Sequence, residues 1–249
     1  MTNLSVVVIT RNRLDKLMRC LDSVKKTLNG CQIIVVDNGS NDGTGDYLKA
    51  RRNIESVILP TNLGVAGARN IGIKKASKDY LMFLDDDAWI DRLDLVAIES
   101  YFQNNPNVCI IAPRILNPNG TIQESMRSFP TFAALFWRGT KLYKLFPNVS
   151  WYRKYIVQDL STIKEVDWAI GACQIIRRRL FDKLGPLDEK YFFGYEDTDF
   201  CYRAKQVGYS TVFWPDSIVY HDYARISSKG LNKQLFRHCI SIGRFFLKN

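Results

Sequence analysis

Short apolar runs alternate in the first part of the chain with segments whose apolar residues recur every three or four positions. Residues 4–10 and 32–37 are rich in β-branched residues, which is typical of strands buried on both faces of a parallel sheet. Between them, helical spacing predicts a helix from Leu14 to Leu28, with Asn12 as its N-cap and Asn29-Gly30 as its stop.

The alternation continues through a short helix near 46–51, a weaker strand at 56–59, a helix from 62 to 76 and a strand at 79–84. A strand, helix, strand, helix order predicts an α/β fold with a mostly parallel, Rossmann-like sheet and helices on both faces. Ligands of such sheets bind beyond the carboxyl ends of the strands. Polar residues follow several of these strands, so we expect one shared crevice there.

The pattern is looser in the second half of the chain. It predicts a helix that follows Asp91 and runs to about Asn104, a strand at 108–112, a return to the sheet at 167–176, a short helix at 181–184, a helix at 196–207, a strand at 211–214 and a basic helix at 229–248. Between Ser125 and Gln158 there is no acidic residue, and basic residues are interleaved with aromatic ones. This region carries no clear sheet pattern.

Three consecutive carboxylates, Asp85, Asp86 and Asp87, end the strand at 79–84. Adjacent like charges at a buried strand end raise the cost of ionising one another. A divalent cation with oxygen ligands relieves that cost, and Mg²⁺ or Mn²⁺ suits carboxylates and substrate phosphates. The alternative is an acidic turn that only solvates the strand end.

Two further motifs carry acid–base groups. Glu196 and Asp197 open a predicted helix, where the helix dipole favours carboxylates, so they are either structural or a general base in the crevice. His221 follows a predicted strand, and it is either structural or an additional ligand for a carboxylate-bound metal.

Composition and charge narrow the class of protein. The 249 residues carry a formal net charge of +10, which indicates an anionic partner: nucleic acid, a membrane surface or a phosphorylated substrate. The six cysteines form no C-x-x-C pair, so we expect a reduced, cytoplasmic protein without structural zinc. We also expect no signal peptide and no membrane span, since no apolar run reaches about 18 residues.

Seven segments in this order resemble one family. They are SVVVITRNR, IIVVDNGSNDGT, NLGVAGARNIGI, YLMFLDDDA, VDWAIGAC, GPLDEKYFFGYEDTDFCYR and VYHD. Together they are similar to the inverting nucleotide-sugar glycosyltransferases of the GT-A fold, a large family that includes bacterial rhamnosyl- and galactofuranosyltransferases. The resemblance is weakest between Thr121 and Ser161 and after Tyr223.

The resemblance implies roles for particular residues. Donor nucleotide binding would fall to Thr10, Arg13, Asp37, Asn38, Asn62, Gly64, Arg69, Asp85 and Asp86, the metal to Asp85, Asp87 and His221, catalysis to Asp197 with Glu196 beside it, and the sugar and acceptor pocket to Trp168, Gly171 and Ala172. Asp37 would accept from a base N–H, and Asp87 would be the most direct metal ligand. Glycine at 64 would allow close backbone approach to the nucleotide.

The implied activity is metal-dependent transfer of a sugar, with inversion, from dTDP-rhamnose or a UDP-sugar to a hydroxyl of a glycan or lipid-linked glycan. The alternative is a basic, non-catalytic nucleic-acid-binding protein, which leaves the three aspartates unexplained; under the transferase interpretation no nucleic acid is expected. A dehydrogenase is disfavoured because Thr10-Arg11-Asn12-Arg13 replaces G-x-G-x-x-G, and a sugar-nucleotide pyrophosphorylase because its Gly- and Arg-rich loop is absent.

We expect residues 1–224 to form the transferase domain, with a nucleotide-binding half at 1–112 and an acceptor and catalytic half at 113–224. Residues 225–249 would form a basic amphipathic helix. Two interpretations of that helix stay open. It docks on the domain with its basic face in solvent, or it attaches the enzyme to the inner face of the cytoplasmic membrane.

Overall fold

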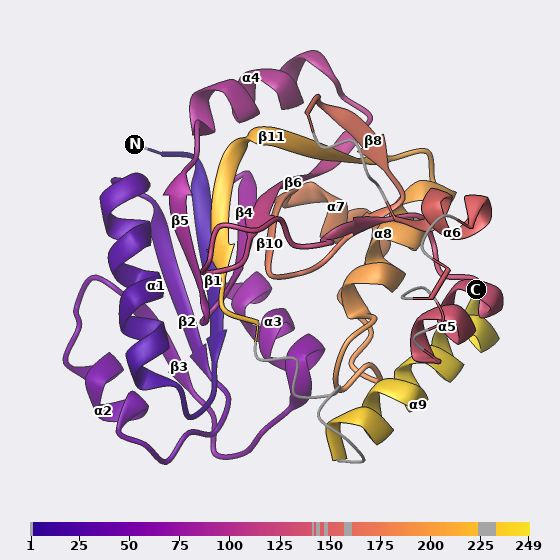
Figure 1. Cartoon of the computed structure of the whole chain (residues 1–249). Coiled ribbons are helices and arrows are strands. Elements are labelled where there is room, and N and C mark those ends of the chain that lie inside the picture. The colour runs from indigo at the N-terminus through magenta and orange to yellow at the C-terminus, as the bar shows by residue number, and fades with distance from the viewer. Residues whose placement is uncertain (1, 141, 143–144, 147–148, 157–160, 224–232) are drawn as a thin grey trace.

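The computed structural model describes residues 2–140, 142, 145–146, 149–156, 161–223 and 233–249, and a single large sheet runs through its centre (Figure 1). Its strands are β1 (Leu4–Thr10), β2 (Gln32–Asp37), β3 (Glu55–Ile58), β4 (Tyr80–Asp85), β5 (Ala88–Arg92), β6 (Val108–Leu116), β8 (Lys164–Val166), β10 (Cys173–Arg177) and β11 (Ser210–His221). Their order is β3-β2-β1-β4-β10-β6-β11-β5, and β8 pairs with β11.

Most of the long pairings are parallel. β1 pairs in parallel with β2 and β4, and β6 pairs in parallel with β11. β10 is antiparallel to both of its neighbours, and β5 is antiparallel to β11. The carboxyl ends of β1, β2, β4 and β11 therefore meet at one edge, as the sequence predicts for a mostly parallel sheet.

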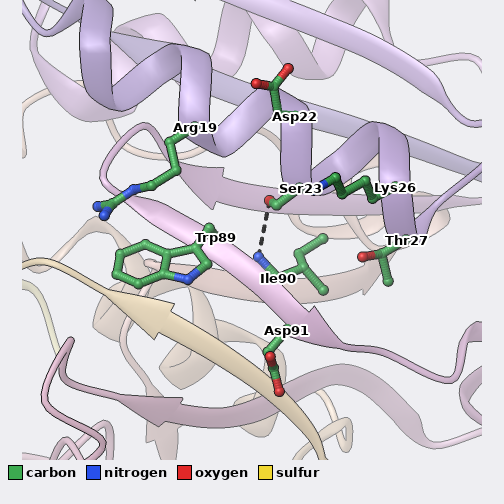
Figure 2. Close-up of a pocket in the computed structure, with 8 residues that line it drawn as sticks. All are labelled: Arg19, Asp22, Ser23, Lys26, Thr27, Trp89, Ile90 and Asp91. Atoms are coloured by element: carbon green, nitrogen blue, oxygen red, sulfur yellow. Dashed lines mark hydrogen bonds between the residues drawn. The ribbon is translucent and has the colours of Figure 1, made fainter.

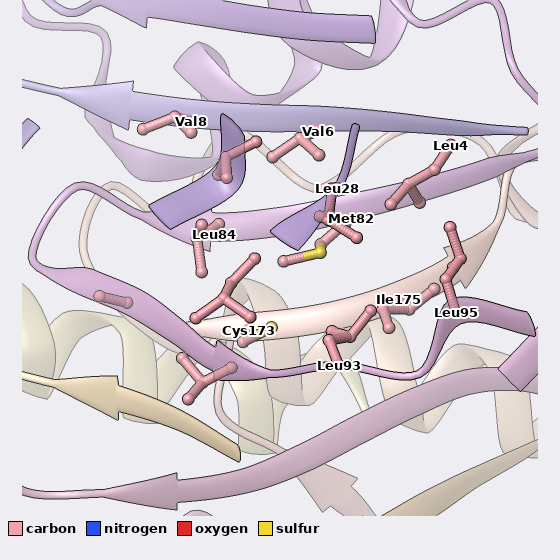
Figure 3. Close-up of a cluster of buried hydrophobic side chains, with 14 of the residues drawn as sticks. Leu4, Val6, Val8, Leu28, Met82, Leu84, Leu93, Leu95, Cys173 and Ile175 are labelled. Atoms are coloured by element: carbon pink, nitrogen blue, oxygen red, sulfur yellow. The ribbon is translucent and has the colours of Figure 1, made fainter. Parts of the chain in front are cut away.

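Helices cover both faces of the sheet because successive strand residues point to opposite sides. The helices against the sheet are α1 (Leu14–Thr27), α2 (Thr44–Lys49), α3 (Gly64–Lys75), α4 (Leu95–Asn104), α7 (Arg179–Leu184) and α8 (Glu196–Gln206). Val6 and Val8 of β1 join the cluster that α1 and α4 complete, part of which Figure 3 shows. Val7 points the other way, into the cluster of α3, α7 and α8.

A smaller group of elements flanks the sheet. It comprises β7 (Met126–Arg127), α5 (Phe132–Gly139), α6 (Ser150–Tyr155), β9 (Trp168–Ala169) and α9 (Lys233–Lys248). In Figure 1, α9 lies beside α5, and Phe132 stacks on Phe246 with ring centres 4.0 Å apart. Among the described residues, no helix is both long and apolar enough to cross a bilayer.

Several predicted elements need correction. β5 was not predicted, and β11 extends to His221 instead of ending at Trp214. Asn12 does not cap α1: its φ is 53°, and its side-chain oxygen accepts from Asn41 N (2.8 Å) in the next loop. The end of the acid-free region, at Gln158, and the predicted beginning of the basic helix, at Lys229, lie outside the described residues.

Candidate active site

Asp85 ends β4, Asp86 and Asp87 form the turn that leads to β5, and the end of β11 brings His221 to them. One ligand atom from each of Asp85, Asp87 and His221 lies within 4.8 Å of the others. His221 Nε2 is 3.2 Å from Asp87 Oδ1 and 4.0 Å from Asp85 Oδ2. The three predicted metal ligands therefore meet at one point, although His221 is far from the two aspartates in the sequence.

Gln123, which the sequence analysis did not single out, fixes the ring of His221. Its Nε2 donates to the His221 carbonyl (2.9 Å), so its Oε1 is left to accept from His221 Nδ1, 2.9 Å away. An imidazole that donates from Nδ1 presents the lone pair of Nε2 toward the carboxylates. Two carboxylates and an imidazole oriented in this way fit a divalent cation such as Mn²⁺ or Mg²⁺.

Asp86 turns away from that cluster toward β1. Thr10 Oγ1 donates to its Oδ2 (2.8 Å), and Arg13 Nη1 donates to its Oδ1 (3.0 Å). Arg13 also contacts Asp87 Oδ2 at 2.8 Å. Burial raises the pKa of Asp86 to about 6, against the opposing charge of Arg13. Three residues predicted to bind the nucleotide therefore contact one another beside Asp85, Asp87 and His221, which we call the cation cluster because together they could hold a metal ion.

Asp37 has an unused acceptor. Its Oδ1 accepts from Ser40 N (3.0 Å), whereas its buried Oδ2 has no hydrogen-bond partner. A buried carboxylate oxygen without a partner is costly, and such atoms in folded proteins call for an explanation. A ligand N–H, as predicted for a pyrimidine base, would satisfy it.

Asn38 and Asn62 shape the loop that leads into α3. Asn38 Nδ2 donates to Asn62 Oδ1 and to the Gly64 carbonyl, both at 3.0 Å. Gly64 has φ +79°, and a Cβ there would lie 2.7 Å from the Phe192 carbonyl oxygen. Glycine at 64 therefore allows a close approach of the backbone to Phe192, and the predicted contact of Gly64 with a nucleotide stays a prediction.

Arg69 links the two ends of the site. Its buried guanidinium donates to Asp85 Oδ1 (2.8 Å), to Glu196 Oε1 (3.2 Å) and to the Gly171 carbonyl (2.7 Å). It lies between the carboxylates of the cation cluster and those at the start of α8. A direct contact of Arg69 with the nucleotide stays a prediction.

The beginning of α8 presents two carboxylates with different environments. Asp197 is half-buried; its Oδ2 accepts from Gly171 N, and its Oδ1 from Thr198 N, both at 2.7 Å. Glu196 is buried, and its Oε2 has no hydrogen-bond partner. Burial, with the neighbouring charge of Asp197, raises the pKa of Glu196 to about 8. Burial thus favours the protonated form of Glu196.

The three residues predicted to line the sugar and acceptor pocket lie beside this pair. Gly171 contacts Arg69 and Asp197 through its backbone. Trp168 and Ala172 are 7% and 2% exposed, and their side chains belong to the hydrophobic core. The Ala172 carbonyl accepts from Asp85 N (3.0 Å), so Ala172 helps to position the strand end. Contact with a sugar stays a prediction for all three.

A groove of about 680 Å³ lies elsewhere, between α1 and β5 (Figure 2). It is lined by Arg19, Asp22, Ser23, Lys26, Thr27, Trp89, Ile90 and Asp91. Arg19 lies over Trp89, 3.6 Å from its ring centre, and Ser23 Oγ accepts from Ile90 N (3.0 Å). None of the predicted site residues lines it, so we place the candidate chemistry at the strand edge.

Residues 5–185 match the family described as "Glycosyl transferase family 2". The chain belongs to this family. The predicted glycosyltransferase class is thereby confirmed, with the inverting mechanism that is general to family 2, and the nucleic-acid-binding alternative loses its support. The match ends before Glu196, Asp197 and His221. The roles of all the predicted site residues, inside and outside the match, stay predictions.

Three relatives with named activities are similar over most of this chain. The N-acetylglucosaminyl-diphospho-decaprenol L-rhamnosyltransferase of Mycobacterium tuberculosis is 27% identical over 94% of this chain and 81% of its own length. The dTDP-rhamnosyl transferase RfbF of Shigella flexneri is 25% identical over 88% of this chain and 69% of its own length. The hexosyltransferase Agl10 of Haloferax volcanii is 29% identical over 70% of this chain, which spans about half of that relative (53%).

Solved structures of glycosyltransferases share the fold. GalNAc-T7 with UDP, GalNAc and Mn²⁺ superposes with a TM-score of 0.69 at 19% identity, over 94% of this chain and 45% of that one. Staphylococcus aureus TarS 1-349 superposes with a TM-score of 0.61 at 18% identity, over 99% of this chain and 72% of that one. The predicted GT-A fold is confirmed for this family 2 chain.

Proposed function

We propose that this family 2 chain transfers a sugar from a nucleoside-diphosphate sugar to a hydroxyl of a glycan acceptor, with the help of a divalent cation. The observation that carries the proposal is the convergence of Asp85, Asp87 and His221 at the sheet edge where Asp197 also lies. Residues 1–112 would supply most donor contacts and residues 113–224 the acceptor side.

The geometry supports the following roles. Asp85, Asp87 and His221 would hold the cation, which when bound neutralises charge on the leaving diphosphate. The free oxygen of Asp37 would accept the base N–H of a uracil or thymine ring. Asp197 would take the proton of the attacking hydroxyl.

The pKa of Glu196, near 8, gives it a distinct role. A protonated carboxyl donates a hydrogen bond, which an ionised one cannot. Glu196 would therefore hold an acceptor oxygen or orient Asp197 without competing for the hydroxyl proton. Arg69 would keep Glu196 and Asp85 in place.

The names of two relatives support a choice of substrates. Both the mycobacterial and the Shigella relatives are named rhamnosyltransferases, and the former acts on a decaprenol-linked sugar. We therefore propose dTDP-rhamnose as the first donor to test, with UDP-sugars next, and a lipid-linked glycan as acceptor. Such an acceptor would place the enzyme at the inner face of the cytoplasmic membrane, in surface polysaccharide synthesis.

A thermal-shift assay with dTDP, UDP and GDP, each with Mn²⁺, Mg²⁺ or EDTA, tests the donor and cation proposals. We expect the cation to increase the stabilisation by the preferred nucleotide, because a ligand that binds the native state raises its stability. Asp87→Ala should lose that increase, and Asp91→Ala, which removes an exposed carboxylate on β5, should keep it. The cation site would be refuted if Mn²⁺ increased the stabilisation by the nucleotide as much in Asp87→Ala as in the wild type.

A further inference from the structure

One side of α9 is used to hold the loop before α8. Ser241 Oγ donates to the Phe193 carbonyl (3.2 Å), and the ring of Phe245 lies 5.7 Å from that of Tyr195. Both side chains on α9 are buried. The helix is thus fixed by its inner side to the segment that carries Glu196 and Asp197.

The outer side of α9 is apolar. Phe236, Ile240 and Leu247 are 68%, 52% and 92% exposed. Their spacing of four and seven residues places them along one side of a helix. Single exposed apolar residues are ordinary, but a row of them indicates an interaction surface.

α5 extends this row. Phe132 and Phe136, four residues apart, are 72% and 66% exposed. Phe132 stacks on Phe246 of α9, so the two helices lie together, as Figure 1 shows. We call Phe132, Phe136, Phe236, Ile240 and Leu247 the α5–α9 surface.

The charge of the segments that contain α5 and α9 favours an anionic partner. Residues 125–158 and 223–249 contain no Asp or Glu. Arg244 and Lys248, which the sequence places on the basic face of the helix, instead contact Asp188 at 2.6 and 3.2 Å. The outer side of α9 is therefore apolar within basic segments. A second copy of the chain would bring like charges together, whereas an anionic leaflet complements them.

We propose that the α5–α9 surface rests on an anionic lipid leaflet, with its apolar side chains among the acyl chains. The inference rests on the proposed function, since a lipid-linked acceptor gives such contact a purpose. A helix with its side chains is about 10–12 Å thick, and interfacial helices insert by about 5–10 Å. The loop that leads to Asp197, which α9 contacts from its inner side, would then stand just above the headgroups.

Co-sedimentation with vesicles of phosphatidylcholine, with and without phosphatidylglycerol, tests the α5–α9 surface. We expect the wild-type chain to bind the anionic vesicles and Phe236→Ser/Ile240→Ser/Leu247→Ser to partition at least about tenfold less well. The matched control is Val96→Ser/Ile122→Ser/Val207→Ser, which changes three exposed apolar residues elsewhere and should bind as the wild type does. Phe136→Ser/Leu247→Ser provides a second variant if the triple one folds poorly.

Three results would overturn the proposal: a wild-type chain that stays in the supernatant, variants that bind as tightly as the wild type, or a wild-type dimer that the triple substitution makes monomeric while vesicle binding persists. An assay of sugar transfer to a water-soluble acceptor distinguishes a failure of the membrane proposal from a failure of the proposed function. The triple variant should keep that activity. A wild type that binds vesicles but transfers to no acceptor refutes the proposed function and leaves the surface assignment standing.

Discussion

Asp197 accepts two backbone N–H groups, and this holds its carboxylate in a fixed position. Asp197→Asn keeps the size of the side chain but cannot take a proton, and its single oxygen can accept only one of the two backbone N–H groups. We expect transfer to fall by about 10²–10⁴-fold, as is usual on loss of a general base, with the donor dissociation constant unchanged. Steady-state kinetics and donor titration measure the two effects. Loss of donor binding, or turnover close to that of the wild type, would move the role to another residue.

Glu196 makes the stability of the fold depend on pH. Its raised pKa means that the folded state keeps a proton that the unfolded chain releases above about pH 4.5. The free energy of unfolding should therefore fall as pH rises from about 4.5 to about 8, by at most about 1.4 kcal/mol per pH unit. Denaturant titrations in EDTA should show that Glu196→Gln reduces this slope.

Glu165→Gln is the matched control for that experiment, because Glu165 is exposed on β8. It should retain the wild-type slope. A slope that is identical in wild type and Glu196→Gln would mean that Glu196 is ionised in the folded protein at neutral pH.

The residues that sequence reasoning found are those whose chemistry is visible locally. Asp85 and Asp87 stand in a run of like charge, and the resemblance carried His221 to them. The sequence does not predict that Gln123 belongs to the site, because an uncharged amide in a loop has no distinctive pattern. Its role becomes visible only when the fold places it against His221. The sequence also gave no sign that Gly64 faces Phe192, since that contact joins segments 128 residues apart.

At the scale of elements, the loop before α3 depends on one glycine. In Gly64→Ala the new Cβ meets the Phe192 carbonyl and the backbone keeps a positive φ. We expect a loss of about 2–4 kcal/mol in the free energy of unfolding, from backbone strain and overlap together. Chemical denaturation measures it.

Gly208→Ala separates the two contributions. Gly208 has φ +84°, but a Cβ there meets nothing within 4 Å, so only the backbone strain remains. Its loss should be clearly the smaller of the two. Equal losses in the two variants would show that the Phe192 contact yields without cost.

α9 should support activity through the loop it holds. Arg244 and Lys248 bind Asp188, and Lys248 also binds the buried Asp199 at 2.7 Å. Arg244→Ala/Lys248→Ala leaves these carboxylates short of partners, which should destabilise the fold by about 1–3 kcal/mol and lower kcat. Thermal unfolding and kinetics measure both. Lys233→Ala, at the exposed beginning of α9, should change neither, and an unchanged double variant would contradict the role of α9.

The predictability of each element follows from how local its pattern is. β1 and β2 match their predicted bounds because each is an apolar run ended by turn-forming or polar residues. β5 has no such pattern in AWIDR and exists through its pairing with β11. The sequence predicts that this strand ends at Trp214, because Pro215 and Asp216 interrupt the apolar run. In the structure, β11 continues past them, and its register with β6 shifts between Trp214 and Ile218.

At the scale of the molecule, the net charge of +10 should act on the donor before any contact forms. A positive protein attracts a nucleoside diphosphate, and salt screens this attraction. We expect the KM for the donor to rise several-fold between about 20 and 300 mM NaCl while kcat changes little. A KM that is independent of salt would show that local contacts alone govern donor capture.

The order of strands has a consequence for how the chain folds during synthesis. β4 and β6 are made early, yet β10 lies between them and β11 lies between β6 and β5. Until residues 173–177 and 210–221 leave the ribosome, those early strands present open edges, which are templates for aggregation. Folding must therefore wait for the late strands, and pairings at such long sequence separation are slow to form. A nascent chain that stalls before Cys173 would depend on chaperones to stay unaggregated.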